Sequence, residues 1–108
     1  MPPPGHNRYT EIYKPLRDHA IQLQEQFHDF TGGNFNDPKA HIIHHEIQQL
    51  ISDIDGRREP MGIDFRIKSI QNQLGEAKNA PQAFMNREHY DYMHRSYESM
   101  RQNLHKFE

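Results

Sequence analysis

The chain has 108 residues and a formal net charge of −2, which fits a single domain. It contains no cysteine, and this excludes a disulfide scaffold, a thiolate metal site, a cysteine nucleophile and an iron–sulfur protein. Ile, Leu, Phe and Val together number only 21, a fraction close to that of disordered proteins. Disordered proteins usually also carry a large net charge, which this chain lacks, so its composition does not exclude a folded domain. No apolar run approaches the ~18 residues of a membrane span, and no signal peptide is visible, so we expect a cytoplasmic protein with no membrane partner.

Residues 1–9 are predicted to form a flexible tail, because three prolines and a glycine near the start favour an extended, solvated chain. The opening Gly5-His6-Asn7 resembles the tails of small phage and prophage proteins over these three residues, which implies a phage origin but names no family. Residues 10–108 are expected to form one helical-bundle domain.

Apolar residues recur at alternating steps of four and three in four segments, which is the spacing of one buried helix face. The first helix is predicted to begin between Ile12 and Pro15 and to end at residues 31–34, where two glycines tolerate a positive φ. The second helix has Asp37 as its N-terminal cap and ends at Gly56. Both helices therefore have clear sequence boundaries.

The third helix is predicted around the stripe that runs from Ile63 to Ala77, and the fourth begins at Pro81 or Asn86 and runs almost to the last residue. A fourth helix of about 20–26 residues would extend roughly 30–40 Å, against about 25 Å for the other three. Valine is absent and threonine occurs only twice, so strands are not expected. The predicted fold is all-α, an antiparallel bundle of about four helices with a longer C-terminal helix.

An overhanging C-terminal helix would expose an apolar stripe that needs a partner, and a homodimer is the simplest way to cover it. Tyr, Met and Arg are enriched at protein interfaces. We therefore expect a small non-enzymatic binding or regulatory protein, of the inhibitor, immunity or adaptor type, that docks a helical face on a protein partner. The candidate partner-binding residues are Tyr92, Arg95, Tyr97, Met100, Arg101, Leu104 and Phe107.

A metal-binding bundle is the first alternative, because carboxylates and histidines on facing helices build metal sites in bundles. The candidate ligands are His19, His44, His94 and Glu98. Hemerythrin-like and ferritin-like proteins order such residues differently, so the chain matches neither family. The pair His41 and His45 is expected to face water, and no cofactor is predicted.

A small phosphorylated ligand is the second alternative, held by Gly32, Gly33 and Asn34 ahead of a helix N-terminus. No catalytic residues are predicted, since the four serines lie within helical patterns and none sits in a Gly-x-Ser-x-Gly motif. Residues 54–108 contain nine Lys and Arg against eight Asp and Glu. This balance makes nucleic acid an unlikely partner, because such binding depends on many neutralised phosphates.

Overall fold

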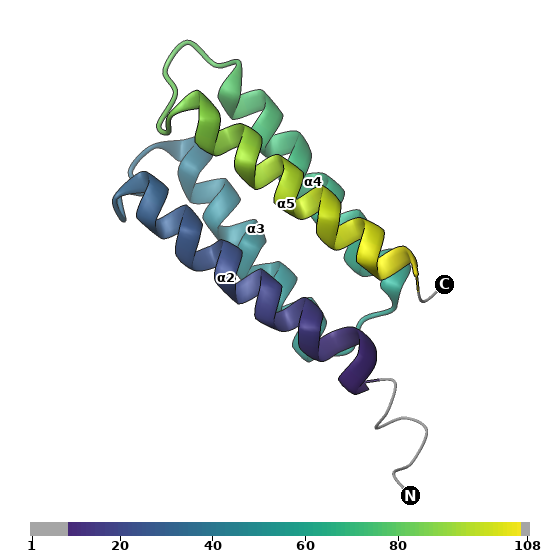
Figure 1. The fold of residues 1–108 in the computed structure, drawn as a ribbon. Helices are drawn as coiled ribbons and strands as arrows, with labels where there is room; N and C mark the ends of the chain where they lie inside the picture. The colour runs from purple at the N-terminus through teal and green to yellow at the C-terminus, as the bar shows by residue number, and fades with distance from the viewer. Residues whose placement is uncertain (1–8, 107–108) are drawn as a thin grey trace, which may run out of the picture.

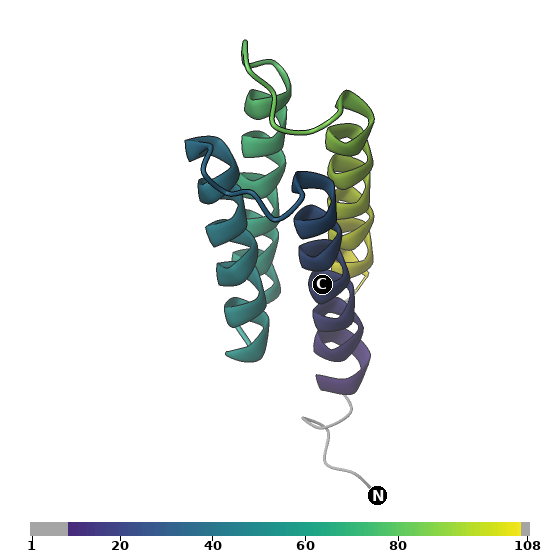
Figure 2. The ribbon, with the colours of Figure 1, turned by 90° about the vertical axis from the view of Figure 1, so that its left-hand side faces the viewer.

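The computed structural model describes residues 9–106, which form an all-α bundle with no strand (Figure 1). Its elements are the π-helical turn η1 (Tyr9–Tyr13) and the helices α2 (Lys14–Thr31), α3 (Pro38–Asp55), α4 (Pro60–Lys78) and α5 (Arg87–His105). Each helix packs on the next along the chain, and α5 returns to pack on α2 (Figure 2). The predicted four-helix bundle is confirmed.

The core is built from the apolar stripes that the three-four spacing predicted. One helix face per segment points inward, and almost every large side chain on these faces is buried. Phe30 is only half-buried, whereas Met85 in the α4–α5 connection is buried although no helical pattern includes it. The buried stripe residues are Leu16, Ala20, Leu23, Phe27, Ala40, Ile43, Ile47, Leu50, Ile54, Ile63, Ile67, Ile70, Leu74, Ala77, Tyr90, Met93, Tyr97, Met100 and Leu104.

The expectation of a longer C-terminal helix is wrong for the described residues. Helix α5 has 19 residues, as does α4, and it begins at Arg87 rather than at Pro81. The Tyr90 hydroxyl accepts hydrogen bonds from the backbone N–H groups of Phe84 and Met85, at 3.0 and 3.3 Å. These bonds fold the connection back over the start of α5, so the helix cannot extend toward Pro81.

At the other end, the regular helix α2 begins at Lys14, within the range that the sequence predicted. The wider turn of η1 precedes it. Pro15 has no N–H to donate to the carbonyl of Glu11, so a regular α-helical bond is missing where η1 meets α2. Residues 1–8 of the predicted tail lie outside the described residues. Within the described range, no helix combines the length and the apolar character that crossing a membrane requires.

Polar contacts along both sides of α4 lock it between its neighbours. On the side of α5, the buried Asp64 accepts hydrogen bonds from Arg101 at 2.8 Å and lies 3.1 Å from the His105 ring nitrogen. On the side of α3, Arg66 donates to Asp53 at 3.0 Å and to Glu46 at 3.2 Å. The sequence pattern did not predict these contacts.

The N-terminal cap of α3 generates a prediction with a matched control. The Asp37 carboxylate accepts from the N–H groups of Lys39 and Ala40, whereas Asn86 at the start of α5 makes no side-chain cap bond. Asp37→Ala should lower the free energy of unfolding by about 1 kcal/mol, and Asn86→Ala should change it much less. Urea unfolding measures both, and equal losses would contradict the assignment of the cap.

Candidate protein-binding surface

Three of the predicted partner-binding residues are not available to a partner. Tyr97, Met100 and Leu104 are at most 2% exposed, because the other helices of the same chain cover this face of α5. The prediction that these three residues bind a partner is therefore wrong, since they belong to the core. The sequence pattern was that of a buried stripe, and only the expected overhang had assigned these residues to a partner. Phe107 lies outside the described residues.

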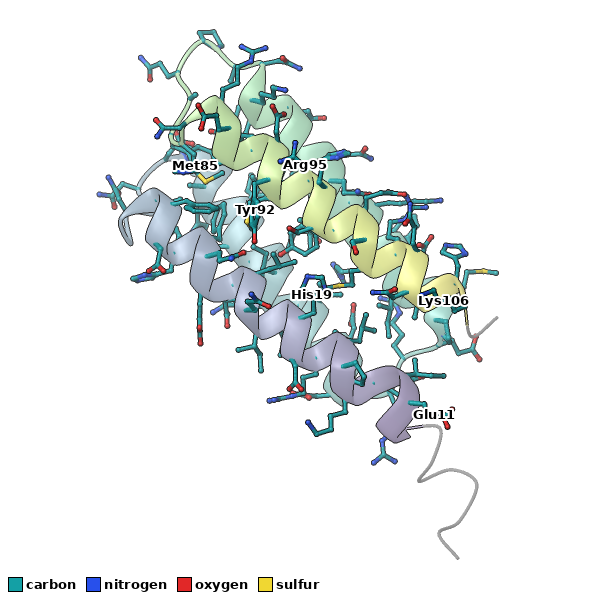
Figure 3. All side chains as sticks on the ribbon, in the orientation of Figure 1. Glu11, His19, Met85, Tyr92, Arg95 and Lys106 are labelled. Atoms are coloured by element: carbon teal, nitrogen blue, oxygen red, sulfur yellow. The ribbon has the colours of Figure 1, made fainter. Side chains whose placement is uncertain are left out.

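Two other predicted partner residues, Tyr92 and Arg95, remain at the surface. Tyr92 is 38% exposed, and its hydroxyl accepts a hydrogen bond from Gln26 of α2 at 3.0 Å. Figure 3 shows Tyr92 pointing toward α2, whereas Arg95 points away from it. Arg101 is largely covered, because its guanidinium bonds Asp64 and Glu98. Only Tyr92 and Arg95 are thus left as an exposed pair on α5.

The four candidate metal ligands do not form a site. Among the described residues, no group of three His, Asp or Glu side chains is arranged to hold a metal ion. His94 is exposed, although the helical pattern placed it near the core, and Glu98 instead bonds Gln71 and Arg101. His19 lies toward α5 (Figure 3), whereas His44 stacks on Phe35 near the α2–α3 connection. The predicted ligand set is wrong because its members face different neighbours.

The Gly32-Gly33-Asn34 loop does not offer its backbone to an anion. Both glycines have a positive φ, and the N–H groups of all three residues donate to carbonyls of Asp29, His28 and Thr31. These bonds end α2 in the way that glycine C-caps do. Since the Asp37 carboxylate also occupies the start of α3 as its cap, the geometry does not favour the predicted phosphate site, which stays a prediction.

The most exposed large apolar side chains lie on α4. Met61 is 78% exposed and Phe65 is 70% exposed, and they stand four residues apart on one helix face. Ile67 in the same helix is completely buried, so α4 presents apolar side chains both to the core and to the solvent. Single exposed apolar residues are ordinary, but two large ones side by side make this face of α4 a candidate contact surface.

Cations border this pair on both sides. The Arg58 side chain lies across Gly62, where an added Cβ would collide with it, and Lys68 follows Phe65 by three residues. We call Arg58, Met61, Phe65 and Lys68 the α4 patch. The patch was not predicted from the sequence, although a signal was available, since Met61 and Phe65 fall outside the stripe of Ile63 and Ile67.

Helices α2 and α5 contain buried polar atoms that lack hydrogen-bond partners, unlike the charged groups that α4 shares with its neighbours. In the described residues, three buried polar atoms have no hydrogen-bond partner: Gln26 Oε1, His89 Nδ1 and the Tyr97 hydroxyl. All three belong to α2 or α5. A hollow between these helices, bordered by His19 and Met100, has a volume of about 60 Å³. It is much smaller than the ~300–1,000 Å³ of ligand pockets and so does not suggest a small-molecule site.

Comparison with known proteins does not assign the surface, since no family model, curated protein or solved structure matches this chain.

The two buried tyrosines of α5 generate opposite predictions. Burial raises the pKa of Tyr97, so its hydroxyl stays neutral, but it has no partner. Tyr97→Phe should therefore leave the free energy of unfolding unchanged or raise it by up to about 1 kcal/mol. Tyr90→Phe should lower it by about 1–2 kcal/mol, because Phe84 and Met85 lose an acceptor. Urea unfolding compares the two, and a loss of stability in Tyr97→Phe would show that its hydroxyl is bonded.

His44 makes the stability of the α2–α3 end depend on pH. Its ring stacks on Phe35 at 4.1 Å between centroids. Burial lowers the pKa of His44, and the charges of His41, His28 and His45 lower it further. The unfolded chain therefore binds this proton more readily, and stability should fall as the pH drops below about 6.5.

His44→Phe keeps an aromatic ring on Phe35 but removes the titrating group. Unfolding in urea at about pH 7.5 and about pH 5.5 should show a smaller acid-induced loss in the variant than in the wild type. If both proteins lose the same free energy of unfolding, His44 does not contribute to this pH dependence.

Proposed function

We propose that this chain is a non-enzymatic protein-binding module, of the inhibitor, immunity or adaptor type, that docks the α4 patch on a protein partner. The observation that supports the proposal is the exposure of Met61 and Phe65, at 78% and 70%, side by side on one face of α4. Interfaces are dominated by a few large anchors that become buried in the complex, and Phe65 with Met61 would supply them. This moves the predicted docking helix from α5 to α4.

The rigidity of α4 favours the same role. The charged contacts of Asp64 with α5 and of Arg66 with α3 hold α4 in place from both sides. Anchors on a fixed helix lose little conformational freedom when they bind, which reduces the cost of association. The module would act by occlusion or scaffolding through a preformed surface.

Homodimerisation and a cytoplasmic location stay predictions of the sequence. The overhanging helix that suggested a dimer is absent from the described residues, because α5 is no longer than α4. Light scattering on the purified chain tests self-association independently of the α4 patch.

Phe65→Ser tests the proposed function, with Ile42→Ser as the matched control. Both side chains are exposed and neither belongs to the buried core, so both variants should keep the free energy of unfolding within about 0.5 kcal/mol of the wild type. Affinity capture from the native host, followed by mass spectrometry, should lose its specific partner with Phe65→Ser and keep it with Ile42→Ser. Retention of the same partner by Phe65→Ser would contradict docking through α4.

A further inference from the structure

We infer that the partner of the α4 patch is an acidic protein segment, in which carboxylates flank an apolar side chain; this inference rests on the proposed function. Two ion pairs at the border of the patch support this inference: Arg58 with Asp53, and Lys68 with Asp64. In each pair the cation stands at the surface, whereas the anion lies underneath. The patch therefore presents positive charge around its two apolar side chains.

The exposure of the paired groups shows this arrangement. The side chain of Arg58 is 45% exposed, but that of its partner Asp53 is 15% exposed. Lys68 is 54% exposed, and its partner Asp64 is 11% exposed. A partner that approaches from outside meets the guanidinium and the ammonium group first.

The covered carboxylates are also shared with other cations. Asp53 accepts from Arg66 as well as from Arg58, and Asp64 accepts from Arg101 as well as pairing with Lys68. Each carboxylate thus divides its charge between at least two cations. The outer cations, Arg58 and Lys68, remain able to bind carboxylates of a partner while their inner contacts persist.

A second copy of this chain fits the patch poorly. A two-fold contact would bring Arg58 and Lys68 of one copy against the same residues of the other, and like charges in an interface disfavour association. A membrane fits poorly as well. The patch offers two apolar side chains and two cations, whereas basic lipid-binding segments carry about 4–8 Lys and Arg. An acidic protein segment matches both the anchors and the charge.

Photo-crosslinking in the native host identifies what covers the patch. The probe is the full chain with Phe65→p-benzoylphenylalanine, and the same substitution at Ile42 is the control, since Ile42 is an exposed apolar residue on α3. We expect position 65 to crosslink a protein segment in which Asp and Glu outnumber Lys and Arg. The yield should fall as the salt concentration rises.

A charge-reversal variant tests whether the partner is acidic, separately from whether the chain docks through α4. Lys68→Glu is compared with Lys14→Glu, because both lysines are exposed and each pairs with an aspartate four residues away in its helix, at 3.6 and 3.2 Å. Lys68→Glu should lower the crosslink yield at position 65 about tenfold, since a repulsive contact replaces an attractive one. Lys14→Glu should leave the yield unchanged.

The outcomes distinguish the inferred acidic partner from the proposed docking through α4. A neutral or basic crosslinked segment, or a yield that Lys68→Glu does not change, overturns the acidic partner and leaves docking through α4 standing. A crosslink only to lipid, or only to a second copy of this chain, also overturns it. If position 65 crosslinks nothing above the level of position 42, both the inference and the proposed function fail.

Discussion

The buried apolar stripe of α4 and the charged contacts on its two sides together fix how this helix sits in the bundle. Ile67 and its stripe face the core, but Met61 and Phe65 stand on the opposite side of the same helix. Burial of the stripe favours this orientation, since rotation would expose four large apolar side chains and cover only two. Rotation would remove Asp64 from Arg101 and Arg66 from Asp53, and stranded charges of this kind are costly. The ion pairs thus reinforce the orientation that apolar burial favours.

This constraint also accounts for the charge around the α4 patch, the proposed docking surface. Because the carboxylates of Asp53 and Asp64 turn inward to hold neighbouring helices, the cations that accompany them are displaced outward. The apolar anchors and their positive border consequently have one origin.

The fold was predictable because apolar positions repeat locally, and each stripe could be located within a single segment. The burial of Asp64 could not be predicted in this way, since its partner Arg101 lies 37 residues further along the chain. The length of α5 was overestimated because the pattern says nothing about the loop bonds of Tyr90. Met61 and Phe65 could have been found by asking which apolar residues the stripe leaves out. The chemistry of the proposed partner belongs to a second molecule and therefore leaves no periodic pattern in this chain.

The contact between α2 and α5 closes the bundle and joins the two helices farthest apart in sequence. The other neighbouring pairs are hairpins of consecutive helices, which lose less chain entropy when they form. The closing interface is also the smallest of the four, and it contains the buried polar atoms without partners. The α2–α5 contact therefore carries the largest loop-closure cost of the four. We therefore expect local opening of the bundle to begin at this contact, which is the smallest of the four helix pairings.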